Sequence, residues 1–134
     1  MHWLVKEEPE HYNFDRFLAD GSTVWSGVRN PVAQKNLRAM KKGDRVFFYH
    51  TGKEKAVVGT AKVSVEASPD PQDKSGKLVV VELVADKKLK RPVTLAEIKG
   101  AGSFADFALV RIPRLSVMPV TEEQWEAIEA MARA

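Results

Sequence analysis

The chain has 134 residues, of which 44% are hydrophobic and 29% charged, with a formal net charge of +3, which fits one globular domain rather than a disordered or fibrous chain. The absence of cysteine excludes disulfides, thiolate-bound zinc and thiol catalysis. Because the sequence shows no signal-peptide pattern and no run of about 18 apolar residues, we expect a single-domain cytoplasmic protein, residues 1–134, without membrane contact and monomeric by default.

The first 30 residues predict a strand, a helix and a loop. Residues 2–6 are short and apolar, as in a strand. Asn13 can cap a helix over residues 14–20, whose apolar side chains share one face. Residues 22–30 combine glycine with polar residues and are expected to form a loop.

A second helix is expected after that loop. Asn30 followed by Pro31 is the arrangement found when Asn caps a helix and Pro occupies its first turn, and the helix should run to about Met40. Positive charge gathers in and around this helix, which suits a polyanion because each phosphate contact releases counterions. The same side chains could instead be a solvated helix face. They are Arg29, Lys35, Arg38, Lys41, Lys42 and Arg45.

The middle of the chain predicts a hairpin and a third strand. Residues 45–50 are expected to pair with the alternating run from Val57 to Glu66, one side of which is apolar. Residues 68–76 form a loop by composition. Residues 77–84 form a long strand that is too apolar on both faces to be exposed to solvent.

Two capping boxes mark the starts of helices near the end of the chain. Thr94 with Glu97 begins a helix over residues 94–99, and Thr121 with Gln124 begins the closing helix. Between them lie two short strands limited by proline, residues 109–113 and 115–119. Five or six strands with helices packed outside predict an α+β fold, a single small mixed β-barrel without βαβ units.

Motifs for nucleotide, metal and hydrolytic chemistry are missing. Neither GxGxxG nor GxxxxGK[ST] occurs, so a phosphate-loop NTPase is excluded. His2, His11 and His50 lack the spacing of metal ligands, and we expect neither a metal nor another cofactor. A serine hydrolase would need support from a GxSxG elbow, which the sequence lacks.

The three tryptophans differ in their neighbours. Trp3 and Trp125 lie among apolar residues at strand or helix spacing, which indicates core positions. Trp25 is followed instead by hydrogen-bond donors, a cation and a flexible backbone, namely Ser26, Gly27, Arg29 and Asn30. A ring, donors and a cation are the parts that a nucleobase pocket needs. A loop tryptophan can also plug the end of a barrel, so these residues alone leave both interpretations open.

The order and spacing of several motifs resemble the EVE family. The motifs cover nearly the whole chain: VKEEP with Tyr12 just after it, VWSGVRNPVAQKNLRAMKKGDRVFFYH, VVGTAKV, EASPDP, RPVTLAEIK and RLSVMPVTEEQW. EVE domains resemble PUA domains and the YTH readers of methylated adenine. The resemblance implies one PUA-like domain that binds DNA or RNA without catalysis. Its pocket, between the barrel and the first helices, would receive a flipped-out modified base, for example a methylated or hydroxymethylated cytosine or a methyladenine.

The resemblance also implies which residues form the site. The pocket residues are Lys6, Glu8, Asn13, Trp25, Val28, Arg29, Asn30, Phe48, Tyr49 and His50. The flanking phosphates would contact Arg29, Arg38, Lys41 and Lys42. The base is expected to stack on Trp25, while Asn13, Asn30 or a backbone amide bonds its edge, and the modifying group is expected to lie against Val28 or Phe48.

Two departures from the family pattern leave the ligand open. Glu7 replaces a small polar residue, and the loop over residues 70–77 is short. The main alternative is an enzyme, because other PUA-like relatives hydrolyse acylated pyrimidine nucleosides with a lysine, a hydroxyl residue and a carboxylate. Lys6 and Glu8 with a pocket threonine or serine could imitate that set. A protein-interaction module that binds a peptide in the same pocket is a third alternative.

Overall fold

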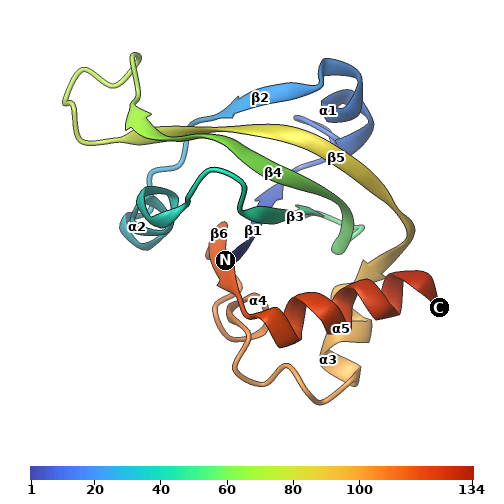
Figure 1. The fold of residues 1–134 in the computed structure, drawn as a ribbon. Coiled ribbons are helices and arrows are strands. Elements are labelled where there is room, and N and C mark those ends of the chain that lie inside the picture. Colours follow the sequence, from blue (N-terminus) through green and yellow to red (C-terminus); the bar gives the residue numbers. More distant parts are fainter.

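The computed structural model describes all 134 residues and contains six strands and five helices (Figure 1). In chain order they are β1 (His2–Glu7), α1 (Phe14–Asp20), β2 (Ser22–Trp25), α2 (Pro31–Ala39), β3 (Arg45–His50), β4 (Ala56–Pro69), β5 (Val79–Thr94), α3 (Leu95–Gly100), α4 (Ala108–Arg111), β6 (Val117–Val120) and α5 (Glu122–Arg133). None of the helices combines the length and the apolar character needed to cross a membrane.

All six strands belong to one sheet with the order β2-β5-β4-β3-β1-β6. Neighbouring strands are antiparallel except β1 and β3, which are parallel because α1, β2 and α2 connect them. This confirms the predicted α+β class, but the edge strands β2 and β6 do not pair with each other, so the sheet curves without closing into a barrel (Figure 1). Irregularities in the register of β4 and β5 accompany the curvature, as bulges bend a strand.

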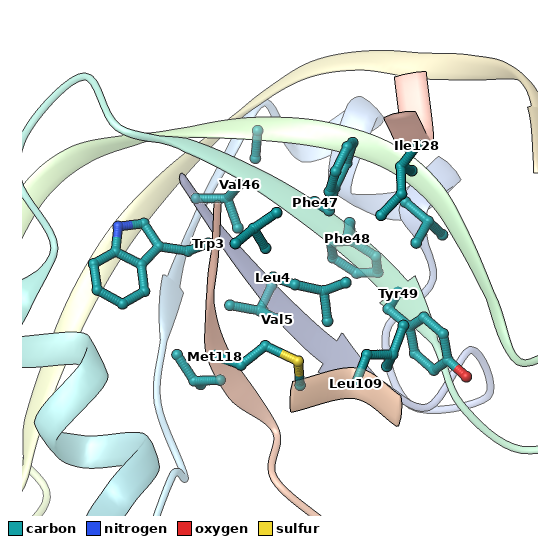
Figure 2. Close-up of a cluster of buried hydrophobic side chains, with 14 of the residues drawn as sticks. Trp3, Leu4, Val5, Val46, Phe47, Phe48, Tyr49, Leu109, Met118 and Ile128 are labelled. Atoms are coloured by element: carbon teal, nitrogen blue, oxygen red, sulfur yellow. The ribbon is translucent and has the colours of Figure 1, made fainter. Parts of the chain in front are cut away.

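The two faces of the sheet are covered by different helices. Successive residues of a strand point to opposite faces, so Phe47 and Phe48 of β3 enter different layers. Phe47 stacks on Trp125 of α5, with ring centroids 3.7 Å apart. Phe48 packs against Phe14 and Phe17 of α1. Figure 2 shows Phe47 and Phe48 among buried hydrophobic side chains from β1, β3, α4, β6 and α5.

The predicted core tryptophans and helix caps are confirmed. Trp3 and Trp125 are each 1% exposed, and the Trp3 indole donates a hydrogen bond of 2.9 Å to Asp44. The side chains of Asn13 and Asn30 accept backbone N–H groups of α1 and α2, and both capping boxes are formed. Local sequence therefore sets where the helices begin.

Three predicted elements need correction. Residues 109–113 do not form a strand: Leu109 to Arg111 belong to helix α4, because the backbone N–H groups of Arg111 and Ile112 bond back to the carbonyls of Phe107 and Ala108. Residues 22–30 are not wholly a loop, since the first four form β2 and pair with β5. The strand predicted over residues 77–84 starts at Val79 and continues to Thr94.

The predicted alternation of β4 holds only in part. Residues 56–61 are buried on both faces. Helix α1 packs on the Gly59 side, and Phe47, the register partner of Thr60 on the other side, stacks on Trp125 of α5. At Gly59, a Cβ atom would lie 2.3 Å from the ring of Phe14. Glycine is thus required here for α1 to approach the sheet. Val65, expected on the buried side, is 48% exposed.

Candidate nucleic-acid interface

A cavity of about 220 Å³ lies between α1 and the strand β2, beside Trp25. Its walls come from the end of β1, the turn after it, α1 and β2. The lining residues are Glu7, His11, Tyr12, Arg16, Thr23, Val24, Trp25 and Ser26. Pockets for drug-sized ligands occupy about 300–1,000 Å³, so this smaller cavity suits a single ring system. Its place beside the first helix agrees with the location that the sequence motifs implied.

Trp25 is both a core residue and a wall of this cavity. The pairing of β2 with β5 sets Trp25 opposite Val81, and the indole is 6% exposed. Its ring packs edge to face on Phe48, with centroids 5.6 Å apart and an angle of 84° between the rings. Trp25 is therefore held rigidly, and only a small part of its surface is open to a ligand.

Tyr12 supplies a second aromatic ring to the same cavity. Its hydroxyl donates to the Asp20 carboxylate at 2.8 Å, and the guanidinium of Arg16 lies 5.3 Å from its ring centroid. Burial and the bond to Asp20 raise the pKa of Tyr12 above its ordinary value, so its hydroxyl stays protonated at neutral pH.

Glu7 brings a carboxylate into the lining. Its Oε1 atom accepts the backbone N–H of Glu8 at 2.9 Å and lies 3.2 Å from Nδ1 of His11. The other oxygen, Oε2, forms no hydrogen bond within the chain. The side chain is only 25% exposed, so Glu7 is an oriented acceptor with one free oxygen. The residue that departs from the family pattern is thus part of this cavity.

Of the ten predicted pocket residues, Trp25 alone lines this cavity. Lys6 precedes Glu7 on β1 and points to the opposite face, together with its partner in the register, Tyr49. Those two residues line a second cavity of about 260 Å³ beside α3 and α4. Phe48 is fully buried beneath Trp25 and offers no surface to a ligand.

The remaining predicted pocket residues lie elsewhere. Asn13 and His50 line a third cavity of about 360 Å³ on the other side of α1. Glu8, Arg29 and Asn30 are exposed, and Val28 is half-buried against the core. The structure therefore does not bring the ten residues around one ligand.

His50 has a structural role in the α1 layer. Its Nε2 atom accepts the backbone N–H of Phe14 at 3.1 Å, and its Nδ1 atom lies 2.7 Å from the carboxylate of Glu54. This pattern requires the hydrogen on Nδ1. His50 thereby anchors the first residue of the helix that walls the Trp25 cavity.

Gln34, which sequence reasoning missed, fixes the loop after Trp25. Its side chain is 3% exposed and donates to the carbonyls of Val28 and Val79, at 2.7 and 3.1 Å. It also accepts the backbone N–H of Val79 at 2.9 Å. The available signal was its spacing, because Gln34 lies three residues before Leu37 and therefore on the apolar face of the helix, where a buried amide must be hydrogen-bonded.

The predicted phosphate-binding residues lie on the α2 side of that loop. Figure 1 shows that β2 leads from α1 to this helix, so the basic segment follows the cavity along the chain. Arg38 donates to the backbone carbonyl of Lys77 at 2.5 Å. Arg29, Lys41 and Lys42 are exposed and form no ion pair, which leaves their charges available to a polyanion.

The sequence and structure resemble known proteins. A sequence model of the EVE domain family matches residues 1–131. Human thymocyte nuclear protein 1 (THYN1) is 32% identical over 95% of this chain and 72% of its own length. The NMR structure of a protein from Rhodopseudomonas palustris has a TM-score of 0.94 at 47% identity, over 98% of this chain and 92% of that one. The crystal structure of human THYN1 in complex with DNA containing 5-methylcytosine has a TM-score of 0.91 at 30% identity, over 99% and 98%.

Proposed function

This chain belongs to the EVE domain family, and we propose that it is a non-catalytic module that binds DNA carrying a modified base, with the base in the Trp25 cavity. The main support for this proposal is the cavity itself, which combines two aromatic residues with a polar rim and has room for one ring system. The complex of human THYN1 with DNA containing 5-methylcytosine supports DNA as the polymer and cytosine as the base.

Trp25 and Tyr12 provide the stacking surface in this proposal. Aromatic stacking of a base contributes about 1–3 kcal/mol. Because Trp25 is already fixed against Phe48, little conformational entropy is lost when a base docks on it. Because only a small part of the indole is exposed, a base can contact only the edge of the indole or part of the indole face.

Glu7 would determine which bases are accepted. A carboxylate oxygen accepts a hydrogen bond from the exocyclic amine of cytosine or adenine. Thymine and uracil present a carbonyl oxygen at the equivalent position, which a carboxylate repels. The free Oε2 atom of Glu7 therefore favours amino-bearing bases, in agreement with a methylated cytosine.

A methyl group on the base would lie against apolar surface at the rim. Val24 lines the cavity and is 54% exposed, and Trp25 lies next to it on β2. One methyl group in an apolar pocket contributes about 1–3 kcal/mol, which is roughly 10- to 200-fold in affinity. We expect the lower end of this range, because Val24 remains open to water.

The hydrolase alternative requires a lysine, a hydroxyl and a carboxylate around one ligand. Lys6 and Thr51 do line one cavity, but no carboxylate is among the residues around it. Glu7 lines the cavity on the opposite face, and Glu8 is exposed. This separation favours binding over hydrolysis as the proposed function.

The test is binding of fluorescein-labelled single-stranded DNA with one central cytosine, 5-methylcytosine, 5-hydroxymethylcytosine or N6-methyladenine, followed by anisotropy. We expect the 5-methylcytosine strand to bind most tightly, and Trp25→Phe to remove most of that preference. Val65→Ala, at an exposed position of β4 outside this cavity, is the control and should bind as the wild type does. Equal affinity for all strands in all three proteins would contradict a base pocket at Trp25.

A further inference from the structure

The second cavity, on the face of β1 opposite to Trp25, has a different chemical character. Three lysines line it, Lys6, Lys55 and Lys99, and none of its other lining residues is acidic. Five of the ion pairs in this chain join a lysine or arginine to an acid. The three lysines of this cavity form none, so their positive charge is not neutralised within the chain.

Lys6 is the most buried of these cations. Its ammonium donates to the carbonyl of Pro113 at 2.8 Å and lies 5.6 Å from the ring centroid of Tyr49. Burial lowers the pKa of Lys6 below its ordinary value, because the ammonium has lost part of its hydration. An ammonium has three hydrogens, so two remain for a ligand.

Two hydroxyl groups in the same lining lack partners. Oγ1 of Thr51 is buried and forms no hydrogen bond, although the backbone N–H of Thr51 is bonded to the carbonyl of Glu7 at 3.0 Å. The hydroxyl of Tyr49 also forms none, and burial raises the pKa of Tyr49, so it remains a donor. A buried hydroxyl without a partner is costly, and a bound acceptor would remove that cost.

Lys55 occupies an unfavourable backbone conformation. Its φ angle is 46°, and it is the one residue other than glycine with a positive φ. Its carbonyl accepts the backbone N–H of Leu95 at 2.8 Å, which holds the turn in place. Glycine would adopt this conformation with less strain, so the lysine side chain at this position costs conformational free energy. Strained residues of this kind gather at functional sites.

We propose that this cavity binds a phosphate group. Its oxygens would accept hydrogen bonds from the ammonium groups of Lys6, Lys55 and Lys99 and from the hydroxyl of Thr51. The phosphate could belong to a nucleic-acid backbone or to a free phosphate or phosphate monoester. Lys6 and Glu7 are consecutive, so both cavities lie at the same end of β1, but phosphate binding does not depend on a base at Trp25.

The test is a titration of the ¹⁵N-labelled protein with inorganic phosphate, followed by NMR. We expect the backbone amides of Thr51, Gly52 and Lys99 to shift together and to saturate. The decisive variant is Lys55→Gly, which removes one ammonium while releasing the strained backbone, so the melting temperature should stay equal or rise. Phosphate affinity should fall roughly two- to fivefold, the range of one partly exposed ion pair. Lys53→Ala, an exposed neighbour outside the cavity, should change neither quantity.

The source of the phosphate is distinguished by two further titrations, with cytidine 5′-monophosphate and with a single-stranded oligonucleotide that has no terminal phosphate. Saturable shifts at the same amides with the oligonucleotide identify a backbone phosphate, and shifts with the monophosphate alone identify a small ligand. Either result supports the proposal. Phosphate binding should persist in Trp25→Phe even if that variant no longer binds a base. Unsaturable shifts spread over all lysines, or equal affinity in Lys55→Gly and wild type, would overturn it.

Discussion

Two cavities lie at the same end of β1, on opposite faces of the sheet, and they differ in chemistry. The Trp25 cavity combines aromatic rings with the carboxylate of Glu7, whereas the Lys6 cavity combines lysines with hydroxyl groups and has no carboxylate. The difference arises from one step along a strand, because Glu7 and Lys6 point to opposite faces. One sheet can therefore offer a base-binding surface on one side and an anion-binding surface on the other.

The largest effect is expected from truncating the wall of the first cavity. Trp25→Ala should lower the free energy of unfolding by about 3–5 kcal/mol, because it removes a buried indole from contact with Phe48. Urea denaturation followed by circular dichroism measures this. Tyr49→Phe, which removes only a hydroxyl without a partner on the other face, should cost little. If Trp25→Ala unfolds at the urea concentration of the wild type, Trp25 is not the packed wall described above.

The next effect comes from Gly59, which lets α1 reach the sheet. Gly59→Ala places a methyl group where the Phe14 ring lies, and overpacking of this kind costs about 1–3 kcal/mol. Thermal denaturation should show the loss, and binding of DNA at the Trp25 cavity should weaken because α1 forms one wall. Phosphate binding beside Lys6 should persist.

Gly100 provides the matched control for that substitution. A Cβ atom at Gly100 meets nothing within 4 Å, so Gly100→Ala should leave the melting temperature equal or higher. Equal melting temperatures for Gly59→Ala and the wild type would show that α1 does not need this close approach.

A smaller effect is expected from Glu7, and it concerns preference rather than stability. Glu7→Gln replaces a charged acceptor by a neutral one, and charge-assisted hydrogen bonds are about twice as strong as neutral ones. The ratio of affinities for strands with a central cytosine and a central thymine should fall about fivefold, which corresponds to about 1 kcal/mol. The ratio is the quantity to measure, because removing an acid raises the affinity for any polyanion. Glu8→Gln, which is exposed outside the cavity, should leave the ratio unchanged.

The smallest effect concerns the pH dependence of the second cavity. Because burial lowers the pKa of Lys6, the unfolded chain binds more protons than the folded one just below pH 10.5, and stability contributed through Lys6 rises with pH in that window. Reductive ¹³C-methylation and NMR should show Lys6 titrating below the exposed methylated lysines of the same chain, and bound phosphate should move the transition upward. A Lys6 transition at or above those of the exposed lysines without phosphate would contradict the burial of its ammonium.

The parts of the fold that depend on local sequence could be predicted. Asn13 and Asn30 cap helices because the side chain and the N–H groups that it accepts are only a few residues apart. The strand predicted over residues 109–113 was wrong because a short, mainly apolar segment ending in proline fits a short helix as well as a strand. The extension of β5 beyond Val84 was not predicted, because its charged residues are typical of a loop. Pairing with β4 is what makes them a strand.

The candidate cavity was predictable in its general place and in Trp25, but not in its other lining residues. Trp25 stood out by its polar neighbours, but family motifs give the order of residues and not the face of the sheet to which each one points. Strand alternation alone would have separated Lys6 from Glu7 and Tyr49 from Phe48. The contributions of Tyr12 and Thr23 could not be derived, because they depend on how β2 pairs with β5 and how α1 packs over that edge.

The most direct test of a base in the Trp25 cavity uses the indole N–H resonances of the three tryptophans. The indoles of Trp3 and Trp125 are buried in the core and serve as internal controls. On titration with a single-stranded oligonucleotide containing one 5-methylcytosine, we predict that the Trp25 resonance shifts and saturates while the other two stay in place. The unmethylated strand should give the same shift only at about a tenfold higher concentration. An unchanged Trp25 resonance in the presence of bound DNA would contradict the account.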